Sequence, residues 1–170
     1  MQRTTHQLYL SIGGNLGQRK ANLAKAIELT SEEMGMVSQV SPIYETKAWG
    51  VENQPDFLNQ ALLVETMLSP EAALSTVLKI EAAMGRVRER KWYTRLIDID
   101  ILFYDDLVIN TPKLTVPHPF IANRNFVLAP LADIAPDFIH PVLQKSVREL
   151  YRICKDPLPV TTFLSKYTTK

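Results

Sequence analysis

Residues 97–104 read IDIDILFY and predict a β-strand whose two faces differ. Residues two apart in a strand point to the same face, so Asp98 and Asp100 project together while the isoleucines pack on the opposite side. Two adjacent carboxylates repel each other, and burying them is costly unless a cation compensates their charge. A hard divalent ion such as Mg²⁺ suits this role, because it takes one or two carboxylates and completes its shell with water and phosphate oxygens.

The residues before this strand predict the rest of a sheet and two helices. Alternating apolar residues predict strands, and apolar residues three and four apart predict helices. Ser69, Pro70 and Glu71 are typical of a helix start, because serine caps the helix and proline fits its first turn. The expected strands lie at 7–13, 37–49, 56–67 and 97–104, and the expected helices at 18–34 and from 70 to just before Gly85. This β-α-β-β-α-β order predicts an α+β sandwich, an antiparallel sheet with helices on one face.

The second half of the chain gives weaker signals. A short strand at 107–109 is expected to form a hairpin with 97–104, and prolines at 117, 119 and 130 are expected to interrupt the next stretch. Ser146 and Glu149 have capping-box spacing and predict a last short helix. We expect one domain over 1–170, with a loosely packed tail at 155–170.

Composition excludes several classes of protein. The 170 residues carry a formal net charge of only +1, which argues against broad capture of nucleic acid or of an anionic membrane. Cys154 is the only cysteine, so neither an intramolecular disulfide nor a thiolate zinc site is expected. No segment has the length of a membrane span or the form of a signal peptide. We therefore expect a cytoplasmic protein that is a monomer, or at most a weak homo-oligomer.

A cluster of cations precedes the two aspartates. Residues 86–95 read RVRERKWYTR, with Glu89 as the one acid among them. Taken alone, two aspartates in this spacing fit a surface ion-pair network as well as a metal site. Arginines beside them favour a magnesium–polyphosphate ligand, because a guanidinium binds phosphate oxygens in a planar, bidentate way. The glycines at 13 and 14 are expected to form a tight strand-to-helix turn, since no Gly-Lys-Ser/Thr follows to make a phosphate-binding P-loop.

Six segments in order resemble the 6-hydroxymethyl-7,8-dihydropterin pyrophosphokinases of folate biosynthesis. The resemblance implies a ferredoxin-like α+β fold and transfer of the pyrophosphoryl group of ATP to the pterin hydroxymethyl group, with release of AMP. It also implies two Mg²⁺ ions, with ATP as co-substrate and the reduced pterin as the second small-molecule partner. The segments are GGNL (13–16), QPDFLN (54–59), IEAAMGRVR (80–88), RLIDIDIL (95–102), LTVPHP (114–119) and NRNFVLAPLADIAP (123–136).

The resemblance also implies roles for individual residues. Asp98 and Asp100 would hold the metal ions, and Arg86 and Arg95 would act on the phosphates. The loop 85–94 would close over both substrates through Trp92, and we expect it to be poorly ordered without them. The implied ATP contacts are Glu81, Arg88, Trp92, Ile101, Lys113, Thr115, His118 and Arg124. The implied pterin contacts are Thr46, Trp49, Phe57, Asn59, Trp92 and Phe126.

Several of these residues have a simpler interpretation. Phe126 could belong to the core, His118 could cap a turn, Trp92 could be an ordinary surface aromatic, and Glu81 could balance helix charge. The sequence departs from the family pattern at Tyr93-Thr94, Leu78, Lys113 and Phe120, and these departures cluster on the nucleotide side.

Two other functions remain open from the residues alone. One is a different metal-dependent phosphotransferase, which the pterin-side segment 54–59 disfavours. The other is an RNA-binding module, which would leave Asp98 and Asp100 repelling phosphate.

Overall fold

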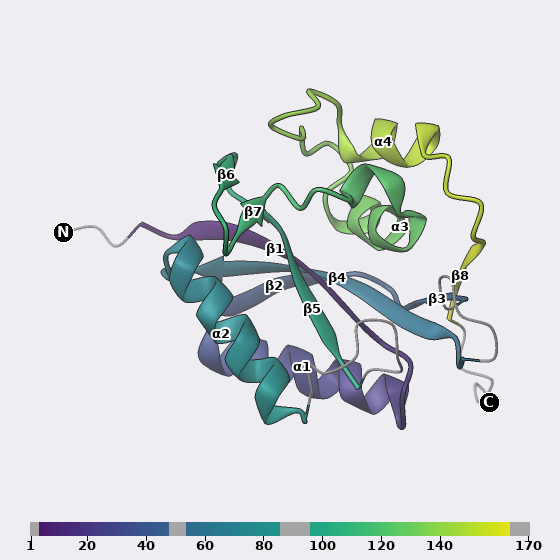
Figure 1. The fold of residues 1–170 in the computed structure, drawn as a ribbon, viewed down its shortest axis with the longest axis horizontal. Helices are drawn as coiled ribbons and strands as arrows, with labels where there is room; N and C mark the ends of the chain where they lie inside the picture. Colours follow the sequence, from purple (N-terminus) through teal and green to yellow (C-terminus); the bar gives the residue numbers. More distant parts are fainter. Residues whose placement is uncertain (1–3, 48–53, 86–95, 164–170) are drawn as a thin grey trace.

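The computed structural model describes residues 4–47, 54–85 and 96–163, and these form layers of helices packed on a β-sheet (Figure 1). The first half contains β1 (His6–Gly14), α1 (Arg19–Glu33), β2 (Met36–Val40), β3 (Tyr44–Thr46), β4 (Phe57–Thr66) and α2 (Pro70–Ala83). The second half contains β5 (Asp98–Tyr104), β6 (Ile109–Asn110), β7 (Thr115–Val116), a 3₁₀ turn (Ile121–Asn123), α3 (Asn125–Ile134), α4 (Val147–Ile153) and β8 (Val160–Thr162).

The main sheet is antiparallel, with strand order β5-β1-β4-β3-β8. β2 also pairs with β4, so β4 carries β3 at its start and β2 near its end. The single strand expected at 37–49 is therefore two shorter strands. With β1 and β4 central and helices in the two crossovers, the arrangement confirms the predicted ferredoxin-like α+β sandwich.

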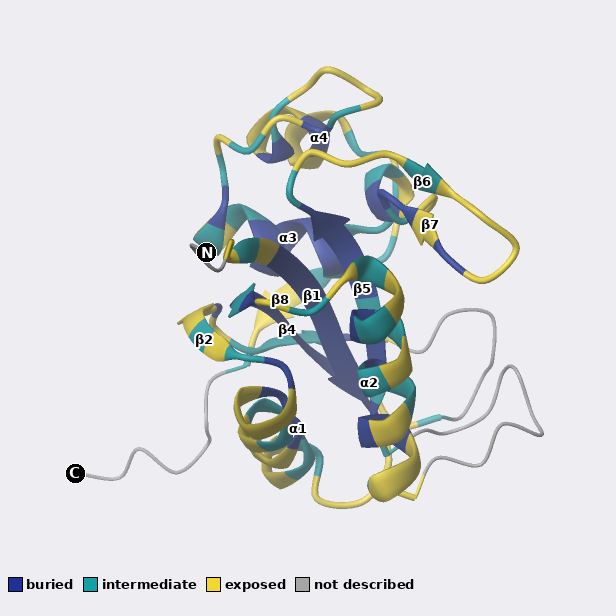
Figure 2. Cartoon of the chain, turned by 90° about the vertical axis from the view of Figure 1, so that its left-hand side faces the viewer, coloured by how far each residue is buried: buried dark blue, intermediate teal, exposed yellow. Residues whose placement is uncertain are grey.

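Helices α1 and α2 cover one face of the sheet, as Figures 1 and 2 show. Their apolar sides bury against alternate residues of the central strands, Leu8, Leu10 and Ile12 on β1 among them. The predicted start of α2 is confirmed, because Ser69 Oγ accepts a hydrogen bond from the Ala72 N–H at 3.1 Å. Ile97, Ile99 and Ile101 belong to the same core, so this core fixes the strand that carries the two aspartates.

The opposite face is also covered by helices, so the expectation that helices lie on one face only is wrong. Figure 2 shows the buried strands between α1 and α2 on one side and α3 and α4 on the other. α3 continues through Pro130, although that residue was expected to interrupt the chain. Its neighbours Val127, Leu128 and Leu131 are buried in this second core, and their burial offsets the backbone hydrogen bond that proline cannot make.

Two connections differ from the sequence-based prediction. β6 pairs with β7 instead of returning along β5 as a hairpin. Asp105 redirects the chain at this point: it has φ +47°, and its carboxylate accepts the Gln7 N–H at 2.7 Å and contacts His6 Nδ1 at 2.7 Å. The strand expected at 107–109 is thereby carried away from β5.

Part of the expected loosely packed tail is ordered against the sheet. Residues 160–162 form β8 and pair with β3, and Phe163 N–H donates to the Ile43 carbonyl at 2.8 Å. Within the described part of the chain, no helix has the length and apolar character needed to cross a membrane.

Candidate active site

Asp98 and Asp100 lie on the sheet face that α3 and α4 cover, as their spacing predicts. Their partners on β1 are Gly13 and Ser11, respectively. Both carboxylates are partly exposed, whereas Ile97, Ile99 and Ile101 on the other face are buried in the first core. The two acids therefore lie on one face of the sheet and are partly exposed at the start of the edge strand β5.

A row of three residues crosses the sheet from the aspartates toward β4. Gly13 of β1 pairs with Asp98 on one side and with Asn59 of β4 on the other. Neighbouring strands lie about 4.8 Å apart, so the Cα atoms of Asp98 and Asn59 are separated by roughly 10 Å. A small molecule held at Asn59 would be within reach of phosphates held at Asp98.

Asn59 is almost completely buried, and its orientation is fixed. Its Nδ2 donates to Thr46 Oγ1 of β3 at 3.2 Å. Thr46 in turn pairs with Phe57, the first residue of β4. The structure thus brings together three of the predicted pterin contacts, Thr46, Phe57 and Asn59, at one end of β3 and β4.

His118 and Arg124 add two further polar side chains to the site beside Asp98. The His118 N–H donates to the Leu102 carbonyl at 3.0 Å, which holds His118 beside β5. Its Nδ1 accepts the Phe120 N–H at 3.2 Å, so the neutral ring carries its proton on Nε2. Burial, and secondly the positive charge of Arg124, lower the pKa of His118 to about 4, although Asp98 acts in the opposite direction. His118 is therefore neutral at physiological pH, and it lies close enough to Arg124 and Asp98 for both charges to affect its pKa.

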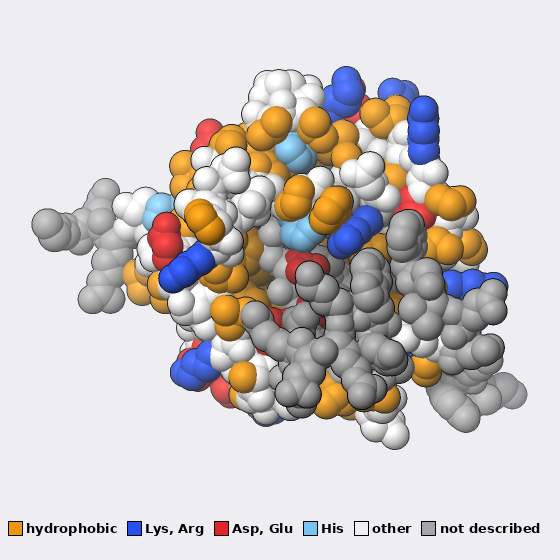
Figure 3. Space-filling view, in the orientation of Figure 1, with side chains coloured by type: hydrophobic (Ala, Val, Ile, Leu, Met, Phe, Trp, Pro, Cys, Tyr) orange, Lys and Arg blue, Asp and Glu red, His pale blue; other side chains and the backbone are white. Residues whose placement is uncertain are grey.

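The exposed surface reflects this arrangement. Figure 3 shows histidine, basic and acidic side chains gathered near the centre of one face, over the region of β5 and α3. Arg124 also stacks over aromatic rings, with its guanidinium carbon 4.8 Å from the centroid of Phe120 and 5.6 Å from that of Phe126. A predicted nucleotide contact and a predicted pterin contact are therefore adjacent at the start of α3.

The N-terminus of α3 is held by a residue far along the chain. Asp156 Oδ2 accepts the Asn125 N–H at 3.0 Å, and the Asp156 carbonyl accepts Asn125 Nδ2 at 3.1 Å. Asn125 separates Arg124 from Phe126, so Asp156 sets the position of both. We call residues 154–163 the C-terminal strap, because they connect the start of α3 to β3 through β8.

Glu81 reaches the site from behind the aspartates. It projects from α2, is only 3% exposed, and its Oε2 accepts the Ile99 N–H at 3.1 Å. Ile99 stands between Asp98 and Asp100. This carboxylate therefore supports the backbone that carries both acids, a role that the sequence did not indicate.

The donor set fits magnesium in chemistry and number. The described residues contain no cluster of three or more His, Cys, Asp or Glu side chains able to enclose an ion. Mg²⁺ commonly binds to one or two protein carboxylates and takes its other ligands from water and substrate phosphates. Two partly exposed carboxylates on one strand face match that pattern.

The other predicted site residues divide into two groups. Lys113 and Thr115 are exposed around β7, and Ile101 is buried in the first core with 6% of its surface exposed. The remaining candidates lie outside the described residues; they are Trp49, Arg86, Arg88, Trp92 and Arg95. The expected closure of the loop 85–94 also depends on residues outside the described part of the chain.

Besides the role of Glu81, the structural roles of Gly13, Asn15 and Asp156 were missed. Gly13 and Gly14 are the last residues of β1 and do not form the expected turn. Buried Asn15 donates to the Pro55 carbonyl at 3.1 Å and so ties the end of β1 to the segment before β4. The capping by Asp156 also has no local signal. Asn15 belongs to the segment GGNL and Pro55 to the segment QPDFLN, but the sequence does not show that these two segments meet.

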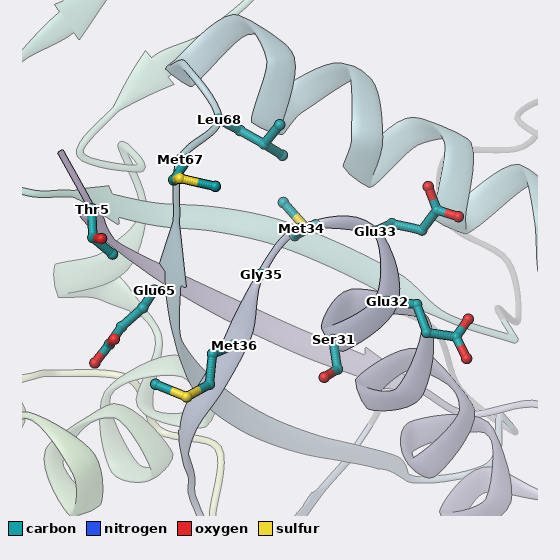
Figure 4. Close-up of a pocket in the computed structure, with 10 residues that line it drawn as sticks. All are labelled: Thr5, Ser31, Glu32, Glu33, Met34, Gly35, Met36, Glu65, Met67 and Leu68. Carbon is teal, nitrogen blue, oxygen red and sulfur yellow. The ribbon is translucent and has the colours of Figure 1, made fainter. Parts of the chain in front are cut away.

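A separate hollow of about 530 Å³ lies at the opposite end of β1 and β4 (Figure 4). Three methionines and three glutamates line much of it, and its lining includes no lysine or arginine. Glutamates would repel a polyphosphate, so this hollow does not suit a nucleotide.

Comparison with known proteins identifies relatives along most of the chain. The family model described as 7,8-dihydro-6-hydroxymethylpterin-pyrophosphokinase matches residues 9–136. A 2-amino-4-hydroxy-6-hydroxymethyldihydropteridine pyrophosphokinase of Aquifex aeolicus is 46% identical over 142 residues, covering 84% of this chain and 88% of that protein. The folic acid synthesis protein fol1 of Pneumocystis carinii is 39% identical over 161 residues, which cover 94% of this chain and 22% of that protein.

Solved structures support the fold. The wild-type HPPK-DHPS of Plasmodium falciparum superposes with a TM-score of 0.73 at 20% identity, covering 88% of this chain and 44% of that one. This chain therefore spans less than half the length of that solved protein, and at this identity the likeness concerns the fold alone.

Proposed function

Because this chain belongs to the 7,8-dihydro-6-hydroxymethylpterin-pyrophosphokinase family, we propose that it transfers the pyrophosphoryl group of ATP to 6-hydroxymethyl-7,8-dihydropterin, releasing AMP, in folate biosynthesis. The observation that best supports this activity is the row formed by Asp98, Gly13 and Asn59. A carboxylate suited to metal-bound phosphate and an amide suited to a heterocycle stand on one face, about two strand spacings apart.

The chemistry that these residues must serve is a single displacement. The pterin hydroxymethyl oxygen forms a bond to the β-phosphorus of ATP, and the bond from that phosphorus to the bridging oxygen of AMP breaks. The hydroxyl proton passes to solvent, and AMP departs with the bridging oxygen. Asp98 and Asp100 would hold two Mg²⁺ ions, and bound Mg²⁺ neutralises triphosphate oxygens.

His118 and Arg124 would bind phosphate oxygens from the other side. Neutral His118 has its Nδ1 occupied by the Phe120 N–H, which leaves Nε2–H as a donor. Arg124 supplies a guanidinium, which binds phosphate in a planar, bidentate way. We further propose Glu81, Arg88, Trp92, Ile101, Lys113 and Thr115 as nucleotide contacts, and Arg86 and Arg95 as the arginines that act on the transferred group.

The pterin would lie between β4 and the start of α3. Asn59 offers an amide for the polar edge of the ring, and Phe57 and Phe126 offer aromatic faces. α3 packs over β3 and β4, which brings Phe126 to the same side as Asn59. Thr46, Trp49 and Trp92 are proposed as the remaining pterin contacts.

We also propose that the protein acts in the cytoplasm as a monomer or weak homo-oligomer, with no nucleic-acid or membrane partner. Its near-neutral net charge of +1 supports the absence of a nucleic-acid or anionic-membrane partner. Light scattering after size-exclusion chromatography would test the oligomeric state.

The decisive experiment separates the nucleotide products. The protein is incubated with ATP, Mg²⁺ and the pterin, and AMP and ADP are resolved by chromatography. We expect AMP in equal amount to the pterin product. None should form after EDTA treatment, and Asp98→Asn should form it at least about 10³-fold more slowly. ADP as the product would indicate phosphoryl transfer. AMP formed without an equal amount of pterin product would indicate hydrolysis of ATP. Either result would reject the proposal.

A further inference from the structure

We infer that Gly13 is a positioning residue for the pterin, acting through Asn59: the absence of a side chain on β1 allows the Asn59 amide to occupy its binding position. This inference rests on the proposed function. Gly13 itself would not touch the substrate in this role. It would determine where the residue that touches the substrate can lie.

The geometry at Gly13 leaves no space for a β-carbon. A Cβ built there would stand 2.5 Å from Asn59 Oδ1, 3.1 Å from the Leu58 carbonyl oxygen and 3.5 Å from Asn59 Cγ. Non-bonded carbon and oxygen atoms need more than 3 Å, so the Asn59 amide lies in the volume that any other residue at 13 would fill. The closest conflict is with a side chain, and the backbone contact is tight but smaller.

Asn59 has no easy way to move aside. It is 4% exposed, and its Nδ2 donates to Thr46 Oγ1 at 3.2 Å. Rotating the amide away from a β-carbon at 13 would break this hydrogen bond or turn Oδ1 away from its present place. A buried amide that loses its partner binds a ligand less well, because both its donors and its acceptor are then misplaced.

The backbone at Gly13 does not itself require glycine. The positive φ angles found among the described glycines belong to Gly17, Gly35 and Gly85. Gly13 is instead a paired residue within β1, where a side chain would ordinarily stabilise the strand. The close approach of Asn59 therefore explains this glycine.

Gly35 provides a matched contrast. A Cβ at Gly35 would stand 2.2 Å from the Glu65 carbonyl oxygen, and its φ is +138°. Gly35 lies beside the hollow at the far end of the sheet, as Figure 4 shows. Alanine at 35 would therefore strain the backbone far from the site, whereas alanine at 13 would displace a binding side chain.

The test is a double-mutant cycle between positions 13 and 59. The dissociation constant of 6-hydroxymethyl-7,8-dihydropterin is measured by calorimetry in the presence of Mg²⁺ and a non-hydrolysable ATP analogue, together with that of the analogue alone. We expect Gly13→Ala to weaken pterin binding about 10- to 100-fold, the effect of misplacing a buried hydrogen-bonding group. The dissociation constant of the analogue should change less than about threefold. The double variant Gly13→Ala/Asn59→Ala should bind the pterin no more weakly than Asn59→Ala alone.

Each alternative outcome is distinct. If the wild-type protein binds the analogue but not the pterin, the proposed function and the inference both fail. If the wild type binds pterin and Gly13→Ala binds it equally well, only the inference fails. Additive losses in the double variant, or parallel losses of both ligands, would show that Gly13 supports the fold and not Asn59. Gly35→Ala should lower the melting temperature while its folded form keeps wild-type pterin affinity, which separates loss of stability from loss of binding.

Discussion

Replacing Glu81 by alanine should destabilise the protein even without any ligand. Glu81 is 3% exposed, and its carboxylate accepts the Ile99 N–H at 3.1 Å. Removing the acceptor leaves a buried backbone donor on β5 with a missing partner, which costs about 1–3 kcal/mol. For a chain of this length, each kcal/mol lowers the melting temperature by about 2–4 °C, so the expected decrease is roughly 2–12 °C.

Circular dichroism of ligand-free protein measures this effect, with two control variants. Glu81→Gln keeps a carbonyl acceptor at the same reach and should cost less than about 1 kcal/mol. Ser75→Ala changes an exposed residue of α2 and should stay within about 0.5 kcal/mol of wild type. Turnover should fall in Glu81→Ala, because Ile99 links the two aspartates. Unchanged stability of Glu81→Ala, together with lost ATP binding, would refute the anchoring role and assign Glu81 to the nucleotide alone.

Substitutions at four further positions test other parts of the molecule. Asp98→Asn and Asp100→Asn should each lower kcat at least about 10³-fold, because several kcal/mol of metal-derived charge stabilisation is lost. The melting temperature should stay unchanged or rise, because the repulsion between the two carboxylates is relieved. Retained turnover would contradict the metal role. Asp156→Ala should lower the free energy of unfolding by about 0.5–2 kcal/mol and weaken pterin binding, because Phe126 is displaced. Asp156→Asn should retain most of the stability and most of the pterin affinity. Chemical denaturation measures the first quantity and calorimetry the second. Burial lowers the pKa of His140 below 6.5, so the unfolded chain binds a proton more readily than the folded protein does, and stability should decrease as pH falls below about 6.5. Urea unfolding from pH 7.5 to 5 should show a smaller loss of stability for His140→Asn than for the wild type. An equal loss in both proteins would exclude His140 as a cause.

The parts of the fold that could be predicted are those encoded locally. The alternation in 97–104 correctly predicts a strand with Asp98 and Asp100 on one face. The start of α2 was predicted because its signal, Ser69-Pro70-Glu71, acts within a single turn. In both cases the information lies within a few residues, and the tertiary structure agrees with it.

The parts that were missed depend on distant contacts. α3 was obscured because its residues 127–131 are buried on most sides and show no helical alternation, and Pro130 argued against a helix. β8 becomes a strand only because β3 is present to pair with it. Gly13 looks like a turn residue until Asn59 is placed beside it. These assignments required knowledge of which segments become neighbours.

The C-terminal strap has a practical consequence for dividing this protein into fragments. A gene fragment cut to match the family model would stop at residue 136 and lose α4, β8 and Asp156. Val147 and Leu150, which fill the second core, would be lost with them, and the apolar side of α3 would face water. The shortest fragment worth expressing therefore extends through Phe163, well beyond residue 136, where the match to the family model ends.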